Sequence, residues 1–194
     1  MRIEPDFMRK IAAAAAQETL PRFRQAGLVD NKLTSGFDPV TEADRQAEQS
    51  IRALIRETYP QHGILGEEFG LENSDAQYRW VIDPIDGTRS FISGMPLWGT
   101  LVGVTDNGDA VAGMMSQPFI GELFWCDGER SHYEGPHGSK QITTSKIADV
   151  TAATLCTTTP AMFTDERKLA YDRLEGAVQL ARYGTDCYAY AMLA

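Results

Sequence analysis

Two stretches near the start of the chain show the apolar spacing and end signals of helices. Between Pro5 and Ala26 the sequence is rich in alanine, and larger apolar residues recur at roughly helical spacing, which predicts a first helix. Pro21 is expected to bend or end it, because proline removes an amide donor. Thr41-Glu-Ala-Asp44 has the form of a capping box, with Asp in place of Glu or Gln. It predicts a second helix that runs to about Tyr59-Pro60.

Short apolar runs bounded by turn residues predict strands through the middle of the chain. Ile64–Gly66 is expected to be a short buried strand that ends at a pair of glutamates, and Tyr78–Asp83 a second strand that Pro84 breaks. The alternating runs that follow predict an antiparallel meander. Its strands are expected at Leu97–Thr105, Ala110–Gln117, Glu122–Cys126 and Arg130–Glu134, and the stretch Gly135–Ser139 is expected to be a surface loop.

The last quarter of the sequence predicts a strand, a helix and the beginning of another helix. The strand is expected in the threonine-rich stretch Thr151–Thr159, the helix at Asp165–Leu180, and the second helical run at Cys187–Ala194. This run stops within an apolar stretch, without a glycine, asparagine or proline to close it. We therefore expect a chain that is truncated at its carboxyl end.

Length and composition predict a globular protein of one domain, with part of a second. Of the 194 residues 43% are hydrophobic and 23% charged, and no apolar run is long enough for a membrane-spanning helix. The amino terminus lacks the apolar core of a signal peptide, so a cytoplasmic location is the default expectation. Three widely spaced cysteines fit neither a disulfide framework nor a zinc site, and are expected to be buried free thiols.

The net charge of −9 disfavours nonspecific nucleic-acid binding, because phosphate backbones attract lysine and arginine. Phosphate ligands are not excluded. Carboxylates that are grouped closely invite divalent cations, and these cations can hold an anionic phosphate.

The segment Trp80–Thr88, Trp-Val-Ile-Asp-Pro-Ile-Asp-Gly-Thr, is the most informative for chemistry. An apolar strand ends in an acid, a proline turns the chain, and a second acid follows three residues later, so both carboxylates can face one small space. If Gly87 and Thr88 open a helical turn, their amides form an anion site beside the acids. Such oxygen ligands suit Mg²⁺, which can activate water and neutralise a leaving oxygen. On spacing alone, a simple turn remains an equal alternative.

The strings Gly66-Glu67-Glu68 and Trp80–Phe91, at this separation, resemble the inositol monophosphatase family, whose signature is Glu-Glu followed by Asp-Pro-x-Asp-Gly-Thr. Ser90–Val102 and Tyr183–Ala194 are most similar to its histidinol-phosphatase branch. The resemblance implies an α/β (α+β) fold, a layered αβαβα sandwich whose C-terminal part is missing here. Residues 1–145 would form an N-terminal α+β domain with the metal site, and 146–194 the incomplete start of a C-terminal α/β domain.

The resemblance also implies a set of site residues and two or three Mg²⁺ ions. Glu67, Asp83 and the carbonyl of Ile85 would hold the first metal, and Asp83 and Asp86 the second, while Glu67 would also contact a weaker third. Asp44 and Thr88 match the pair that orients and deprotonates the attacking water. The amides of Gly87 and Thr88 would bind phosphate.

Several of these residues have a simpler alternative. Asp44 could be only a helix cap, worth roughly 1 kcal/mol, although the motif favours catalysis. Arg89 could approach the substrate or lie in solvent. In the string Gly184, Thr185, Asp186, which the family places beside the substrate, Asp186 could pair with the amine of histidinol phosphate or cap the last helix. Glu68 is expected to point away from the metals, by strand alternation.

The chain ends before a later segment that carries a further aspartate ligand in the family. Three accounts are open: a truncated chain, which we favour, a natural fragment that pairs with another polypeptide, or a noncatalytic metal-binding remnant. The leading functional hypothesis is a Mg²⁺-dependent phosphatase that converts histidinol phosphate to histidinol by direct in-line attack of water. The alternative is an inositol or related sugar monophosphatase. The expected partner is a small phosphorylated metabolite, with no nucleic acid or membrane, in a homodimer.

Overall fold

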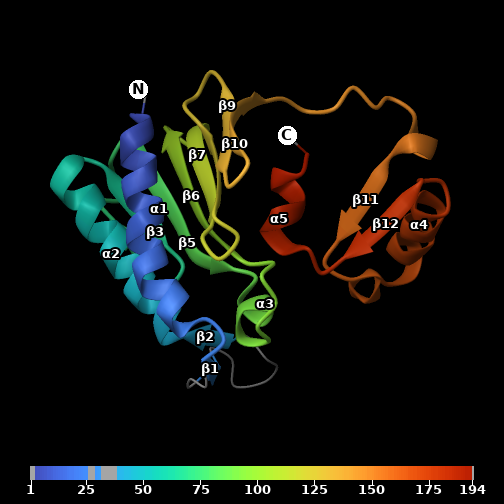
Figure 1. Cartoon of the computed structure of the whole chain (residues 1–194), viewed down its shortest axis with the longest axis horizontal. Coiled ribbons are helices and arrows are strands. Elements are labelled where there is room, and N and C mark those ends of the chain that lie inside the picture. Colours follow the sequence, from blue (N-terminus) through green and yellow to red (C-terminus); the bar gives the residue numbers. More distant parts are fainter. Residues whose placement is uncertain (1–2, 26–28, 32–38, 194) are drawn as a thin grey trace. The chain divides into compact units, whose positions relative to one another are not determined.

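The computed structural model describes residues 3–25, 29–31 and 39–193, and Figure 1 shows the order of the elements. The chain divides into two compact units, Met1–Ile142 and Thr143–Ala194. Each unit is described by itself below.

Two helices open the first unit. α1 spans Pro5–Thr19 and continues into a 3₁₀ turn at Leu20–Arg22. The helix therefore ends well before Ala26, and Pro21 lies in the tighter turn, where its missing N–H does not interrupt an α-helical hydrogen bond. α2 spans Glu42–Thr58, as the capping box predicted.

The first unit is built on one eight-stranded sheet with the strand order β10-β9-β8-β7-β6-β5-β3-β4. From β5 to β10 every strand pairs antiparallel with the next, which confirms the predicted meander, whereas β3 lies parallel to β5. The strands are β3 (Gly63–Gly66), β4 (Gly70–Glu72), β5 (Tyr78–Asp86), β6 (Gly99–Asp106), β7 (Asp109–Gln117), β8 (Glu122–Cys126), β9 (Ser131–Gly135) and β10 (Gly138–Ile142). A separate antiparallel pair joins β1 (Val29–Asn31) to β2 (Pro39–Thr41).

Two predictions for this sheet were wrong. β5 does not break at Pro84 but continues to Asp86, because the proline lies in a bulge, where the strand need not donate to its neighbour. The expected loop at Gly135–Ser139 instead contains the turn into β10. β10 is exposed along most of its length, so it lacks the apolar alternation that identifies a strand.

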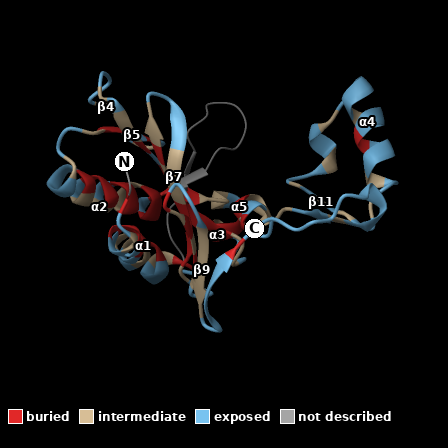
Figure 2. Cartoon of the chain, turned by 90° about the horizontal axis from the view of Figure 1, so that it is seen from above, coloured by how far each residue is buried: buried red, intermediate tan, exposed pale blue. Residues whose placement is uncertain are grey.

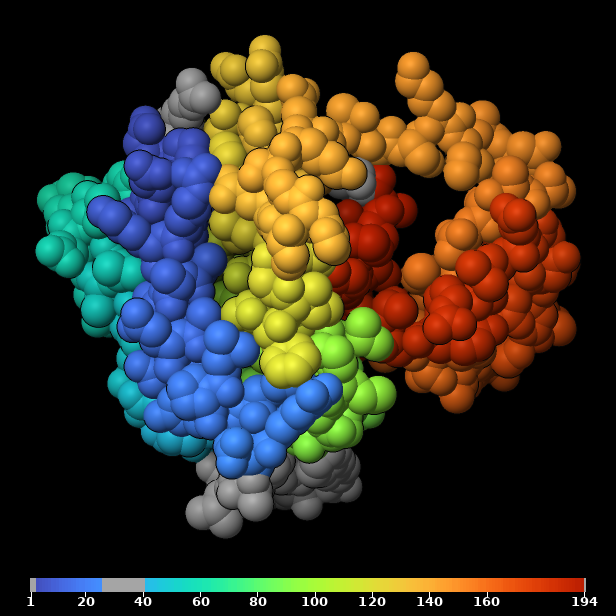
Figure 3. Space-filling view, in the orientation of Figure 1, coloured from blue at the N-terminus to red at the C-terminus, as the bar shows by residue number. Residues whose placement is uncertain are grey.

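The main core lies between the two helices and one face of the sheet, where Figure 2 shows buried residues on α1, α2 and the central strands. Full burial of one such aliphatic side chain contributes about 2 kcal/mol. The members of this main core include Phe7, Met8, Ile11, Ile51, Ile55, Ile64, Trp80, Ile82, Val102 and Trp125. Arg9 of α1 also donates to Glu134 of β9 across 2.6 Å, and Figure 3 shows α1 beside these outer strands.

The second unit contains a parallel pair of strands joined through a helix. β11 (Thr154–Thr157) pairs with β12 (Leu180–Tyr183), and α4 (Asp165–Glu175) connects them. The helix therefore stops before Leu180, which begins a strand. The predicted strand Thr151–Thr159 is shortened to Thr154–Thr157, because a 3₁₀ turn occupies Val150–Ala152. α5 spans Asp186–Ala191.

Two expectations from composition can be compared with the described residues. All three cysteines are free, as predicted, but Cys187 alone is buried, whereas Cys126 is half-buried and Cys156 is exposed. Among the helices that the structure describes, none has the length and apolar character needed to cross a membrane.

Candidate active site

A bulge in β5 brings the two aspartates of the central motif to the same side of the sheet. Asp83 lies opposite Leu101 of β6 and Asp86 lies opposite Gly99, so three steps along β5 correspond to two along its partner. Side chains two residues apart in a strand share a face, and the extra residue of the bulge therefore gives Asp86 the same orientation as Asp83. The Asp-Pro-Ile-Asp spacing therefore places two carboxylates on the same face of the sheet.

Asp83 is the carboxylate that this environment perturbs most. Burial, together with the negative charges of Glu67, Asp86 and Asp44, raises its pKa to about 8. Within the part of the chain that the structure describes, its Oδ1 atom is buried and has no hydrogen-bond partner. A buried carboxylate without a counter-charge is costly, so this oxygen is suited to receive a cation.

Glu67 and Glu68 lie in the turn between β3 and β4. The backbone N–H of Glu67 donates to the carbonyl of Ile82 across 3.2 Å, which holds the turn beside β5. The charge of Glu67 acts on Asp83, and that of Glu68 acts on Asp44. Because these residues are in a turn, the strand alternation that we used to separate the roles of the two glutamates does not apply.

Asp44 closes the capping box at the start of α2. Its Oδ2 atom accepts the N–H and the hydroxyl of Thr41, and the Thr41 hydroxyl accepts the N–H of Ala43. Asp44 is buried, and this burial raises its pKa to about 6 although the bonds from Thr41 oppose the shift. Asp44 therefore takes part in capping the helix, as its sequence position predicted, and this capping does not exclude a further role. A pKa near neutrality also suits a group that exchanges protons, and this second role remains a prediction.

The residues after the bulge form a tight turn into the short helix α3, Thr88–Ile92. Gly87 precedes it with φ 81°, a left-handed conformation that favours glycine. The Thr88 hydroxyl donates to the Ile85 carbonyl across 3.1 Å, and the Thr100 hydroxyl donates to the Pro84 carbonyl across 2.9 Å. The predicted helical opening at Gly87 and Thr88 is thus confirmed.

Hydrophobic packing fixes the position of this turn. The Ile85 side chain is buried in a small second core with Ala43 of α2, Phe91 of α3 and Trp98, and Phe23 completes the cluster. Arg89 of α3 is exposed. The beginning of α2 and the bulge of β5 are therefore joined by one apolar cluster, which explains why Asp44 acts electrostatically on Asp83.

The chemistry of these oxygens fits a hard divalent cation. Carboxylates and backbone carbonyls are its preferred ligands, and Asp83 has a buried oxygen without a partner among the described residues. Within those residues, however, no three His, Cys, Asp or Glu side chains are close enough to form a complete metal site. A cation bound beside Asp83 would offset the mutual repulsion of these carboxylates.

Sequence reasoning missed two buried charged residues next to this site, Glu48 and Arg52. Both lie on α2, four and eight residues after Asp44, and form an ion pair with a distance of 2.7 Å from Arg52 Nε to Glu48 Oε1. The signal is present in the sequence. The row Asp44, Glu48, Arg52 runs directly beside the apolar row Ala43, Ala47, Ile51, Ile55, so the charges border the buried face of the helix.

The remaining predicted residues belong to the second unit. Gly184 has φ 63° and donates its N–H to the carbonyls of Thr157 and Thr158 across 3.1 and 3.0 Å. Thr185 occupies the cap position of α5, and Asp186 is the first helical residue, with φ 43°. The role of these three residues towards a substrate stays a prediction.

The sequence pattern of the inositol monophosphatase family matches residues 6–194. A histidinol-phosphatase of Chlorobaculum parvum is 39% identical over 95% of this chain and 70% of its own length. A chloroplastic bifunctional phosphatase of Arabidopsis thaliana is 40% identical over 81% of this chain and 45% of its own length. A histidinol-phosphatase of Mycobacterium tuberculosis is 32% identical over 77% of this chain and 59% of its own length. The chain therefore spans about half to two-thirds of these relatives.

Solved structures show the same fold. An inositol monophosphatase from Zymomonas mobilis superposes with a TM-score of 0.81, at 34% identity, over 97% of this chain and 71% of that one. An inositol monophosphatase from Anabaena gives a TM-score of 0.71, at 25% identity, over 93% and 66%. The predicted fold class is confirmed by these likenesses.

Proposed function

This chain belongs to the inositol monophosphatase family, and we propose that it forms the metal-binding part of a phosphomonoesterase that hydrolyses histidinol phosphate to histidinol and phosphate. The observation that carries the proposal is Asp83, whose buried oxygen has no partner within the described residues. Neighbouring acids raise its pKa. A structural aspartate would be paired with a cationic side chain or with amides, whereas a metal ligand keeps an oxygen without a protein partner.

The proposed cofactor is Mg²⁺, in two or three ions. Glu67, Asp83 and the Ile85 carbonyl are the proposed ligands of one ion, and Asp83 and Asp86 of another. When bound, the metal supplies positive charge for the phosphate oxygens and lowers the pKa of water. The Ile85 carbonyl has a second lone pair for this purpose beside the hydrogen bond from Thr88.

The protein side chains supply the remaining steps. Asp44, with a pKa raised to about 6, is ionised at neutral pH and can accept a proton from the attacking water. Thr88 would orient that water, and Glu67 completes the catalytic set. The amides of Gly87 and Thr88, at the first turn of α3, would hold the phosphate, with Arg89 at its side. Water would attack phosphorus in line with the departing alcohol oxygen, which takes up a proton from solvent water as its bond to phosphorus breaks, so no phosphoenzyme forms.

The choice of histidinol phosphate rests on relatives and on one acidic residue. Two relatives named histidinol-phosphatase are 39% and 32% identical. Asp186 offers a negative charge that would pair with the amine of this substrate. The rival substrate is inositol 1-phosphate or a related sugar phosphate, which is supported by the Zymomonas mobilis structure and by an inositol-1-monophosphatase of Mesorhizobium japonicum, 37% identical over 58% of this chain. We expect a cytoplasmic homodimer.

Phosphate release from histidinol phosphate and from inositol 1-phosphate, with and without Mg²⁺, tests the proposal. We expect release that depends on Mg²⁺ and prefers histidinol phosphate. A preference for inositol phosphate would overturn the substrate assignment alone. Release from neither, in a protein shown by calorimetry to bind Mg²⁺, would favour the noncatalytic metal-binding alternative.

A further inference from the structure

Glu48 is a fully buried carboxylate whose partners all belong to the turn that carries Glu67, or support that turn. Its side chain is 0% exposed. The Oε2 atom accepts the backbone N–H of Glu68 across 2.7 Å, and Oε1 accepts the N–H of Phe69 across 3.2 Å. These two amides follow directly after Glu67, so Glu48 binds the backbone of the turn rather than any of its side chains.

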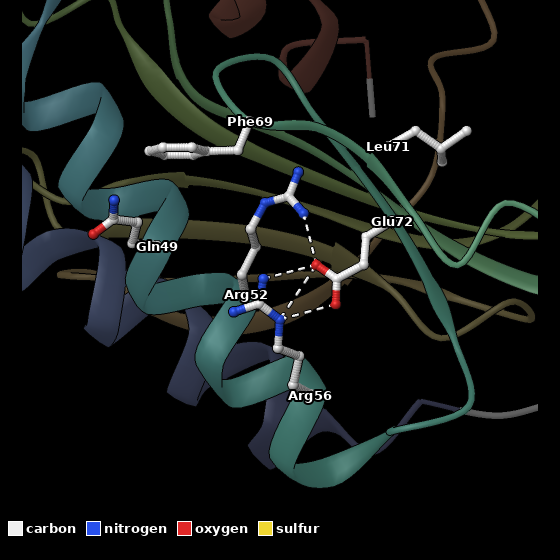
Figure 4. Close-up of a pocket in the computed structure, with 6 residues that line it drawn as sticks. All are labelled: Gln49, Arg52, Arg56, Phe69, Leu71 and Glu72. Carbon is white, nitrogen blue, oxygen red and sulfur yellow. Dashed lines mark hydrogen bonds and ion pairs between the residues drawn. The ribbon is translucent and has the colours of Figure 1, made fainter.

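Arg52 holds the other end of the same turn. Its Nε atom donates to Glu48 Oε1 across 2.7 Å, and its Nη2 atom donates to the carbonyl of Gly70, where β4 begins. Its Nη1 atom donates to Glu72 across 3.2 Å, and Figure 4 shows Glu72 between the guanidinium groups of Arg52 and Arg56. α2 therefore holds this segment at two points. The Glu48 carboxylate accepts from the amides of the turn, and the Arg52 guanidinium donates to the Gly70 carbonyl at its end.

The close approach of Glu48 explains the glycine of the Gly66-Glu67-Glu68 string. A Cβ atom at Gly66 would overlap the Glu48 carboxylate, with Oε1, Cδ and Oε2 all too close. Gly66 has no unusual φ that would require glycine for its backbone conformation. Glycine is therefore needed at position 66 because the Glu48 carboxylate occupies the space that a side chain would fill.

We infer that Glu48 and Arg52 are positioning residues that set where the Glu67 carboxylate lies relative to Asp83. The inference rests on the proposed function, because Glu67 is a proposed metal ligand. α2 carries Asp44 and Glu48 one turn apart, so the same rigid helix fixes the proposed base and the proposed ligand turn. Metal affinity thus depends on two side chains that do not touch the metal.

The arrangement is more demanding than ordinary stabilisation of a turn would need. A buried ion pair is costly to desolvate, and an apolar pair of similar volume is often as stable. An apolar pair has no hydrogen-bond donors or acceptors, so it cannot hold a backbone segment in a defined position. Residues that orient metal ligands typically change metal affinity by about 10-fold to 100-fold when they are altered.

The test uses the full chain and measures Mg²⁺ binding directly. In Glu48→Gln the side chain keeps its shape but loses one acceptor and the charge that pairs with Arg52. We expect the Mg²⁺ dissociation constant, measured by calorimetry, to rise about 10-fold, and the Mg²⁺ concentration for half-maximal phosphate release to rise with it. Glu57→Gln is the matched control, since it makes the same change at an exposed position of α2 and should leave both values unchanged.

Hydrogen exchange provides a second readout, which reports on the hydrogen bonds of the turn directly. The amides of Glu68 and Phe69 should exchange slowly in the wild-type protein although they lie in a turn, and faster in Glu48→Gln. Fast exchange in the wild type, or unchanged Mg²⁺ affinity in a folded Glu48→Gln protein, would overturn the inference. Protected amides in a wild-type protein that binds no Mg²⁺ would overturn the proposed function, and with it the positioning role, but not the contact itself.

Discussion

Asp44 Oδ2 accepts two hydrogen bonds from Thr41, one from the backbone N–H at 2.8 Å and one from the hydroxyl at 2.6 Å. The carboxylate therefore caps α2, and its raised pKa also suits proton transfer. The two roles make different demands on the side chain. Capping needs an oxygen that accepts hydrogen bonds, whereas proton transfer needs a group that ionises.

The variant Asp44→Asn separates these roles. Its amide oxygen can still accept from Thr41, and the cost of burying a charge is removed, so the melting temperature should stay the same or rise. Phosphate release should fall about 100-fold or more, because a general base contributes that much. Thr41→Ala is the complementary variant, and should cost about 1 kcal/mol of stability. If Asp44→Asn kept full activity at saturating Mg²⁺, Asp44 would be a cap only.

The raised pKa of Asp83 predicts how the metal-free protein responds to pH. The ordinary value of 3.8 applies to the unfolded chain, and the folded value is about 8. Between these values the unfolded chain has released the proton and the folded protein retains it, so stability falls as pH rises. We expect the melting temperature in chelator to fall relative to that of Asp83→Asn between pH 5 and pH 8.

Added Mg²⁺ should reverse this dependence, because ligand binding favours the ionised carboxylate. The wild-type protein should gain stability with Mg²⁺ at neutral pH, and Asp83→Asn should gain much less and lose phosphate release. Parallel pH curves for the two proteins in chelator would contradict the assigned environment of Asp83. Unfolding of Asp83→Asn without metal would indicate a structural role instead.

The sequence predicted the parts of the site that local chemistry determines. The capping box at Asp44 is a pattern of neighbouring residues, and the apolar alternation of the meander is equally local. The spacing of Asp83 and Asp86, and then the family resemblance, identified the two carboxylates as a pair, but the backbone geometry that pairs them was not visible in the sequence. It depends on the register between β5 and β6, in which Pro84 lies in a bulge rather than ending the strand.

The failures concern contacts between distant segments. Glu48 bonds to the backbone of residues about twenty positions later, and no local pattern reports such a partner. His62 lies in the polar stretch Pro60-Gln-His-Gly63, which carries no local sign of a buried partner. In the structure it is partly buried and bonded to Trp80, because β5 brings the indole beside the turn.

His62 should make stability sensitive to mild acid. The Trp80 Nε1–H donates to His62 Nδ1 across 3.0 Å, which requires that nitrogen to be unprotonated, and burial lowers the histidine's pKa below its ordinary 6.5. The folded state therefore resists protonation. The contribution is present above about pH 6.5 and is lost as pH falls towards the lowered value. The melting temperature should fall in this window.

His62→Gln is the informative variant for that window, because its side chain can accept from Trp80 and does not titrate. The fall in melting temperature between pH 6.5 and pH 5 should be smaller in this variant. His137→Gln, which alters an exposed histidine, should leave that fall unchanged. An undiminished fall in His62→Gln would assign the pH dependence to other groups.

The last prediction concerns substrate choice and tests the proposed role of Asp186. If its carboxylate pairs with the amine of histidinol phosphate, Asp186→Asn should lower kcat/KM for that substrate about 10-fold to 100-fold, because a charged hydrogen bond contributes about 1.5–3 kcal/mol. The value for inositol 1-phosphate should hardly change, since that substrate has no cation. Asn also tolerates the left-handed conformation of this position, φ 43°. Asp165→Asn is the matched control, because Asp165 also begins a helix of the second unit with φ 51°. Equal losses for both substrates would show that Asp186 supports the fold of α5 rather than the choice of substrate.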